Sequence, residues 1–378
     1  MSDVNPAKNQ SADILQLIRN FADDHIRPRR AELIVSDVFP EDLWQAFAAS
    51  GLAGLSLPED HGSLGANYKL LSAAARVISR TGGVPGVTMV FMAHWLMSKL
   101  HIATDAPSSL QRHLIPSLTA GKTTLSVAIS EPGAGAHPKH LKTTARRDGN
   151  DFVLNGEKAF LTNGPLADQF IVLAITSETD GRKAFSAILV PADSPGFHRT
   201  EGVKIDFLHP CPHGGIALED CRVPVANLLG EEGDAFTKTS MRMRAIEDAA
   251  GAAGQVGSMY CLLSDIAETA GNDLAMEIGA IATRLQALDV IAEHLASMAD
   301  AAGNDLQPLL ELQLGFHQQC QNCSEAFGAL LEKLPDSDSP HINYLFRDIS
   351  KSLSIAKNAH VARLAKIGTT VLHHARSR

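Results

Sequence analysis

Apolar residues recur at helical spacing through the first third of the chain. Four of them follow the i, i+3, i+4, i+7 spacing of one helix face: Ile14, Leu17, Ile18 and Phe21. Further helices are predicted over EDLWQAFAAS, KLLSAAARVISRTG and VTMVFMAHWLMSKLHI. The second of these is stopped by Gly82-Gly83. This pattern predicts an α-helical domain over residues 1–122.

Near Thr123 the pattern changes to short apolar runs separated by turn residues, which is typical of antiparallel β-structure. Asn155-Gly156 is the strongest two-residue hairpin signal, so a hairpin is predicted between strands at 152–154 and 159–161. Two buried strands are predicted over 170–175 and 185–190. We expect about seven short strands in a β-domain over residues 123–234.

From Ala235 onward the helical spacing returns, with apolar residues on one face at Leu285, Leu288, Ile291, Leu295 and Met298. A second helix is predicted from Leu309 to Leu331 and a last one from about Asn343 to His373. The sequence therefore predicts an α+β fold with three parts. They are an N-terminal α-helical domain, a middle antiparallel β-barrel or sandwich, and a C-terminal α-helical bundle over residues 235–378.

Charge and composition narrow the function classes. The chain of 378 residues has a net charge of −9 and no basic patch, which argues against a nucleic-acid-binding surface. The sequence contains no run of about 18 apolar residues, so no transmembrane helix is predicted. The polar N-terminus lacks a signal-peptide core, so we expect a cytoplasmic protein. Five cysteines without a pairing framework fit a reducing compartment.

Several cysteines and histidines resemble metal or redox motifs at first sight. Cys320-x-x-Cys323 lies in a predicted helix and has no second such pair, so we interpret it as two ordinary helix cysteines and expect no metal site. His209 and His213 lie in a Pro/Gly-rich loop and are interpreted as turn residues. His373-His374 is interpreted as part of a tail.

The stretch ISEPGAGAHPKH, residues 129–140, follows a short apolar run and contains two glycines. Glycine permits positive φ and lets backbone approach a ligand, and such loops often offer N–H groups to phosphates. The residues alone leave two interpretations open, a plain turn between strands and the floor of a cofactor site.

Several blocks, in this order, resemble the acyl-CoA dehydrogenase family. They are LPEDHGSLG (57–65), ISEPGAGA (129–136), LNGEKAFLTNG (154–164), GGIALEDCRVPVANLLGEEGDAF (214–236) and AAGAAGQVG (249–257). The resemblance implies flavin adenine dinucleotide (FAD) held between the β-domain and the C-terminal bundle, with an acyl-CoA thioester beside the flavin. It implies α,β-dehydrogenation, an electron-transferring flavoprotein as acceptor, and dimers or tetramers.

The resemblance also assigns cofactor contacts to individual positions. Val127, Ile129 and Ser130 match residues along the flavin ring, Gly135 and Ala136 match the pyrophosphate contact, and Phe160, Leu161 and Thr162 match the segment that packs against the flavin and bonds near N5. Ala136 stands where the family has serine. Asn358 and His360 also fall on cofactor-contacting positions, with changed residue types.

The family's usual catalytic glutamate has no counterpart here, because spacing from Arg347-Asp348 places Ala356 in its slot. A minority of the family carries the base on the first C-terminal helix. Counting ten residues back from Gly257 puts Glu247 there, whereas counting forward from Phe236 points to Ile246. We expect Glu247 to be the base.

Other family features are missing too. Asp248 replaces the arginine after that slot, the Arg-x-x-Phe-Gly segment has no counterpart between 267 and 280, and residues 331–340 replace a glycine-rich turn. Three hypotheses stay open. They are an active dehydrogenase using Glu247, an impaired or half-site subunit that needs a homologous partner, and a flavin-dependent oxygenase of the same fold.

Overall fold

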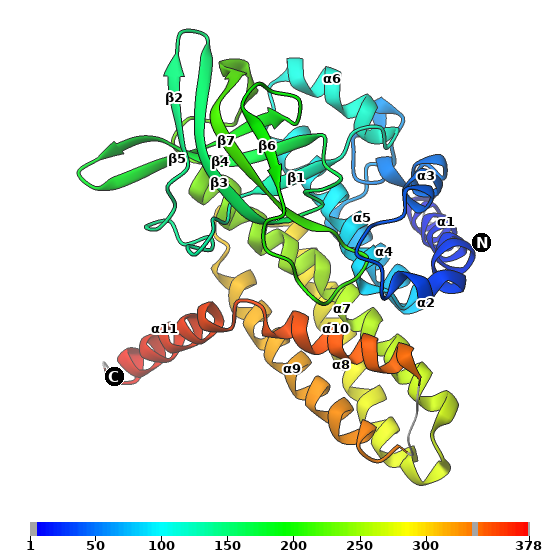
Figure 1. Cartoon of the computed structure of the whole chain (residues 1–378). Helices are drawn as coiled ribbons and strands as arrows, with labels where there is room; N and C mark the ends of the chain where they lie inside the picture. The colour runs from blue at the N-terminus through cyan, green and yellow to red at the C-terminus, as the bar shows by residue number, and fades with distance from the viewer. Residues whose placement is uncertain (1–5, 335–338, 377–378) are drawn as a thin grey trace.

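The computed structural model of the chain describes residues 6–334 and 339–376 (Figure 1). Its N-terminal helices are α1 (Pro6–Phe21), α2 (Arg30–Leu33), α3 (Glu41–Ala49), α4 (Tyr68–Gly82), α5 (Pro85–Met97) and α6 (Ser108–Thr119). The predicted glycine stop of α4 is present, since Gly83 follows the helix with a left-handed φ of 67°. On α1, Ile14, Ile18 and Phe21 are buried, whereas Leu17 lies at the edge of the stripe and is 40% exposed.

The strands follow, in chain order: β1 (Leu125–Ala128), β2 (Thr144–Asp148), β3 (Asp151–Thr162), β4 (Gln169–Thr179), β5 (Arg182–Pro191), β6 (Phe197–Thr200), β7 (His213–Pro224) and β8 (Leu228–Leu229). They form one sheet in the order β6-β7-β3-β2-β4-β5-β8, and β1 pairs with β4. Most pairs are antiparallel, but β1 and β2 each meet β4 in parallel. The interior of this sheet forms its own apolar cluster, which includes Phe152, Leu161 and Phe170.

The hairpin predicted at Asn155-Gly156 is wrong. Strand β3 runs through these two residues without turning, and the β2–β3 hairpin turns instead between Asp148 and Asp151. The Asn155 amide is used across the sheet, where it bonds both the carboxylate and the backbone N–H of Asp220. Gly156 lies at a bulge with φ 143°, and a Cβ there would lie 2.6 Å from the Thr143 hydroxyl. The pair therefore serves a bulge rather than a turn.

Helices return after β8 as α7 (Arg242–Thr269), α8 (Ala275–Asp300), α9 (Gln307–Leu331), α10 (Pro340–Ser354) and α11 (Lys357–Arg376). Figure 1 shows α7 to α10 as a bundle below the β-domain, with α4 beside α7 and α11 extending away. Helices α4 and α7 approach closely at Gly257, where a Cβ would lie 2.5 Å from the Arg76 carbonyl oxygen. One apolar cluster continues from the N-terminal helices into this bundle.

The single last helix predicted from Asn343 to His373 is also wrong, because the chain breaks at Ile355–Ala356. Ala356 has a positive φ of 57°. The serine hydroxyls near the end of α10 bond back to backbone carbonyls, Ser352 to Asp348 and Ser354 to Lys351. Such bonds compete with helix continuation, which helps explain why the helix ends here.

Candidate functional site

The loop after β1 closes on itself rather than opening a helix. The Glu131 N–H donates to the Gly135 carbonyl at 3.0 Å, and the Gly135 N–H donates back at 3.1 Å. Gly133 and Gly135 have φ of 71° and 56°, and a Cβ at either position would meet no atom within 4 Å. Gly135 and Ala136 are exposed. The tip of the loop is thus open to a group approaching its backbone.

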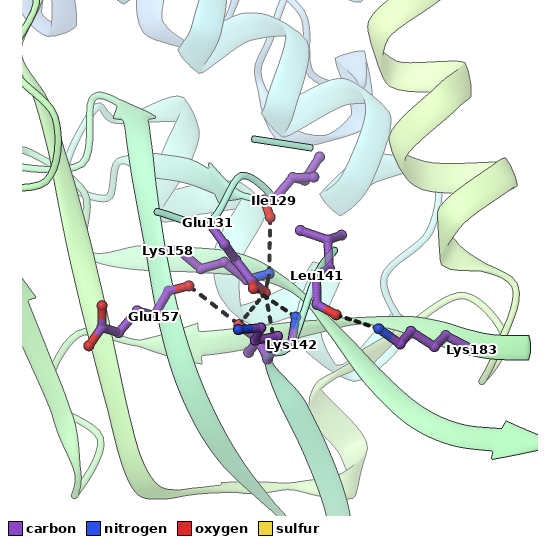
Figure 2. Close-up of polar contacts among 8 residues, drawn as sticks. Ile129, Glu131, Leu141, Lys142, Glu157, Lys158 and Lys183 are labelled. Atoms are coloured by element: carbon purple, nitrogen blue, oxygen red, sulfur yellow. Dashed lines mark hydrogen bonds and ion pairs between the residues drawn. The ribbon is translucent and has the colours of Figure 1, made fainter. Parts of the chain in front are cut away.

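A buried ion pair ties this loop to β3 (Figure 2). The Lys158 ammonium is fully buried and donates to the Glu131 carboxylate and to the Ile129 carbonyl, both at 3.0 Å. Glu131 also accepts the N–H groups of Lys142 and Thr143 and the Thr143 hydroxyl. Burial opposes the charge on Glu131, but the Thr143 bond and Lys158 outweigh it and leave the pKa of Glu131 lowered. Burial lowers the pKa of Lys158 to about 8.

Beyond Lys158, β3 has a second irregularity, between Lys158 and Leu161. There Phe160 takes a positive φ of 60°, and the residue as a whole is 45% exposed. A bulky residue rarely adopts this backbone conformation. The Leu161 side chain instead lies in the core of the β-domain, so only its backbone can serve a cofactor. Thr162, two residues beyond Phe160 on β3, is half-buried and forms a further hydrogen-bonded pair.

That pair is Thr162 with His213 at the start of β7. The His213 Nε2 lies 3.2 Å from the Thr162 hydroxyl, and its Nδ1 lies 3.1 Å from the Cys211 carbonyl. Burial lowers the pKa of His213, so the ring is neutral at pH 7. A carbonyl only accepts, so Nδ1 carries the proton and Nε2 accepts from Thr162. The interpretation of His213 as a plain turn residue missed this contact, because residues 162 and 213 meet only through the β3–β7 register.

Acidic and basic side chains gather at the start of α7. Glu247 is half-buried, and its carboxylate lies 3.4 Å from the Arg244 guanidinium. Asp248, the next residue, is open to water, yet burial raises its pKa to about 6, against the opposing charges of Arg244 and Arg363. Arg244, Glu247 and Asp248 therefore form a charged cluster at the start of α7. The charge of Arg363 also acts on Asp248, so α11 contributes to this charged cluster.

Two histidines from α9 and α11 lie nearby. The rings of His317 and His360 are 4.3 Å apart, and the charges of Arg363 and Arg244 add to burial in lowering the pKa of His360 to about 4. The backbone of Asn358 lies in α11, but its side chain is outside the described part of the chain. Its predicted cofactor contact is therefore not placed.

A small pocket lies where the π-helical segments Ser98–Ala103 and Phe236–Met241 approach each other. Both of its cations already have partners, because Arg242 donates to the carbonyls of Ala302 and Gly303, and Lys238 pairs with Asp234. The pocket is therefore a weak candidate for binding an anion.

Two family profiles match the chain. Residues 9–122 match "Acyl-CoA dehydrogenase, N-terminal domain", and residues 126–221 match "Acyl-CoA dehydrogenase, middle domain". The chain belongs to the acyl-CoA dehydrogenase family. Together the two matches cover more than half of the sequence, and the two domains occur in the family's order.

Characterised relatives agree with this membership. The chain is 32% identical over 221 residues to an acyl-CoA dehydrogenase of Bacillus subtilis, a match that covers 58% of each protein. It is 31% identical over 225 residues to a 3-(aryl)acrylate reductase of Clostridium sporogenes, covering 59% of each. The chain thus spans about three fifths of the length of these relatives.

The fold is that of the family across the whole chain. The solved structure of butyryl-CoA dehydrogenase from Megasphaera elsdenii superposes with a TM-score of 0.83 at 19% identity. The superposition covers 98% of this chain and all of that one. The predicted fold class, with helical, β-sheet and helical parts, is therefore confirmed. The boundaries at 122/123 and 234/235 stay a prediction.

The segment Phe236–Met241, just before α7, is π-helical, with i→i+5 hydrogen bonds. A π-turn accommodates one extra residue in a helix, so it shifts any count of residues along this helix by one. Glu247 as the base stays a prediction.

Ala356 begins the last turn before α11, and the charged neighbours of Asp248 and His360 link α11 to Arg244 on α7. The segment between α7 and α8 is short, and the replaced turn at 331–340 lies partly outside the described residues. Among the described residues, no group of three His, Cys, Asp or Glu side chains is placed to hold a metal ion.

Cys320 and Cys323 are buried, free thiols inside α9. No helix in the described ranges is long and apolar enough to cross a membrane.

Proposed function

We propose that this chain binds FAD between the β-domain and the C-terminal bundle and dehydrogenates an acyl-CoA thioester, with Glu247 as the base. The observation that carries the proposal is that β3 presents an exposed aromatic residue, Phe160, while Glu247 and Asp248 lie in the charged cluster on α7. The exposed glycine loop fits the phosphates, and the half-buried Ser130 and Thr162 fit the polar edges of a flavin ring.

In this proposal each protein group has a defined task. Phe160 packs against the ring system and excludes water from one face. The Ser130 carbonyl is already taken by the Ala159 N–H at 2.8 Å, which leaves its half-buried hydroxyl for the cofactor. When bound, FAD supplies the two-electron oxidation by accepting the β-hydrogen as hydride. Glu247 takes the α-proton as the general base.

Arg244 pairs with that base, since its guanidinium lies 3.4 Å from the Glu247 carboxylate. We infer that substrate entry must loosen this ion pair, since a carboxylate held by a guanidinium is a poor base.

The proposal is tested with the purified chain, alone and without added oxidant. A yellow protein whose visible absorption bleaches anaerobically on addition of an acyl-CoA supports it. Glu247→Gln should abolish the bleaching while leaving the oxidised flavin spectrum in place. Asp248→Asn is the matched control, because it removes the neighbouring carboxylate from the same helix turn. Bleaching that survives Glu247→Gln and disappears in Asp248→Asn assigns the base to Asp248 instead.

A second candidate function is an impaired or half-site subunit of a mixed oligomer. Two observations favour it: Ala356 fills the usual base slot, and α11 carries exposed apolar side chains at Val361, Val371 and Leu372. These side chains fit association with a second chain of this fold. A protein that is colourless alone and turns yellow only when co-expressed with a homologue supports this candidate. An electron-transferring flavoprotein as acceptor stays a prediction.

A further inference from the structure

We infer that the buried Glu131–Lys158 pair positions the ring-binding edge of the site: it holds Phe160 in its strained, outward-facing conformation and keeps Ser130 beside it. The inference rests on the proposed function in one respect, that the ring placed against Phe160 and Ser130 is the flavin of FAD. The pair itself, and its effect on Phe160, can be tested without any cofactor.

The pair joins both sides of the proposed ring edge. From β3, Lys158 reaches the carbonyl of Ile129 and the carboxylate of Glu131, which flank Ser130 in the sequence. One residue further along β3, the Ala159 N–H donates to the Ser130 carbonyl at 2.8 Å. Three hydrogen bonds therefore fix the segment 129–131 to β3 immediately before Phe160. Figure 2 shows Lys158 reaching toward Glu131 and Ile129.

Phe160 is clamped on its other side as well. The Asn163 N–H donates to the Pro212 carbonyl, and the Asn163 side chain donates to the Val90 carbonyl, each at 3.0 Å. Between these anchors Phe160 keeps a φ of 60°, which costs a residue with a Cβ about 1–2 kcal/mol. Such strain persists only where the surroundings hold the backbone on both sides, and it concentrates at functional sites.

A role in stability alone does not account for an ion pair at this position. Replacing a buried pair by apolar groups of similar size is often neutral or stabilising, because both charges lose their hydration. The pair instead provides direction: Lys158 can reach Ile129 and Glu131 together only in one arrangement of loop and strand. The polar pair is therefore suited to fixing register and orientation rather than to adding stability.

The test uses the double variant Glu131→Gln/Lys158→Met, which leaves no buried charge unpaired. The apo-protein is melted in four forms: unchanged, with the double substitution, with Phe160→Gly, and with all three. Glycine relieves the strain at residue 160. We expect the double substitution to lower the melting temperature clearly more in the Phe160→Gly background, because relaxation of the strained Phe160 offsets part of the loss only in the unchanged background. Equal losses in the two backgrounds would overturn the inference, since the pair would then not act through Phe160.

The second readout is FAD binding, followed by quenching of flavin fluorescence. A well-placed aromatic contact is worth about 1 kcal/mol, so the double variant should bind FAD about fivefold more weakly. Lys183→Met is the matched control, because Lys183 caps the carbonyls of Lys139 and Leu141 at the far end of the same loop. It should leave affinity and spectrum unchanged. An unchanged FAD affinity in the double variant contradicts the inference.

Failure of the proposed function is distinguishable from failure of this inference. If the unchanged protein binds no FAD, the proposed function is wrong, but the melting comparison still decides whether the pair holds Phe160. If the double variant fails to fold, Glu131→Gln/Lys158→Gln replaces it in both measurements, because it also leaves no buried charge unpaired and glutamine at 131 keeps an acceptor for Thr143.

Discussion

The two halves of the proposed site are held together by different kinds of contact. On the β-domain side, Ser130, Phe160 and Thr162 lie on strand ends or in a short loop whose neighbours fix them through hydrogen bonds. On the helical side, Arg244 and Asp248 of α7 and Arg363 of α11 interact through charge, and Asp248 is exposed to water. Hydrogen bonds from backbone groups fix positions closely, whereas partly solvated charge pairs are weak and leave side chains free to rearrange.

This difference teaches where the chain tolerates change. The β-domain side keeps the residues proposed to place a flat ring, and its blocks resemble the family most clearly. On the helical side, Ala356 occupies the position of the usual base, and Asp248 occupies the position of the arginine that follows the alternative base. A site whose cofactor is held mainly by one side can lose or move its catalytic base on the other. The variants described next test that division of roles.

The largest expected effect comes from moving the base from residue 247 to residue 356. Glu247→Gln should slow anaerobic flavin reduction by an acyl-CoA about 10²-fold to 10⁴-fold, the usual contribution of a general base. Adding Ala356→Glu should then restore at least part of the loss, because the family resemblance puts the usual base at residue 356. Stopped-flow absorption of the flavin measures both rates. Ala356→Glu in the unchanged background is the control, and no recovery in the double variant would separate the two slots.

A smaller effect is expected at Thr162 on the β-domain side. Because the Thr162 hydroxyl donates its hydrogen bond to His213, it offers only lone pairs to the proposed cofactor. Oxidised flavin N5 accepts hydrogen bonds and reduced N5–H donates them, so this arrangement favours the reduced form. His213→Ala frees the hydroxyl to donate, and one hydrogen bond of about 1 kcal/mol should lower the midpoint potential by about 20 mV.

Thr162→Val supplies the control for that measurement. Without the hydroxyl, His213→Ala should leave the potential where Thr162→Val alone puts it. A drop of the same size in the valine background would show that His213 acts on the flavin by another route, such as its own partial charges. Spectroelectrochemical titration of the four proteins gives the comparison.

Local patterns predicted the fold well where one helix face or one strand face is buried, as on α1, α4 and β4. They failed where a residue pair had two uses: Asn155-Gly156 serves a bulge because Thr143 and Asp220 occupy its neighbourhood. The contacts of Lys158 and His213 depend on strand register, which no local pattern encodes. Lys158 lay inside a block already singled out, whereas His213 was interpreted only as a turn residue.

The third prediction concerns the pH dependence of stability on the helical side. Asp248 has a raised pKa of about 6 in the folded chain against an ordinary value of 3.8. Between these values the folded state binds more protons than the unfolded one, so stability falls as pH rises through this window. Asp248→Asn removes that fall. The variant should melt like the unchanged protein near pH 4 and at a higher temperature near pH 7.

Glu247→Gln is the comparison for this experiment, since it removes a neighbouring carboxylate that already has Arg244 as a partner. It should not raise the melting temperature at pH 7. If Glu247→Gln raised the melting temperature at pH 7 as much as Asp248→Asn does, total negative charge, rather than the surroundings of Asp248, would set the pH dependence of stability.

The smallest effect should come from relieving backbone strain on the helical side. Ala356 is held at a φ of 57°, and glycine adopts this conformation without steric cost. Strain relief of about 1 kcal/mol is partly offset by the greater freedom of glycine in the unfolded chain, so Ala356→Gly should stabilise by a few tenths of a kcal/mol. Urea denaturation measures this. Ala359→Gly, inside α11, is the control and should destabilise by about 0.5–1 kcal/mol, because the same residue lowers stability within a helix.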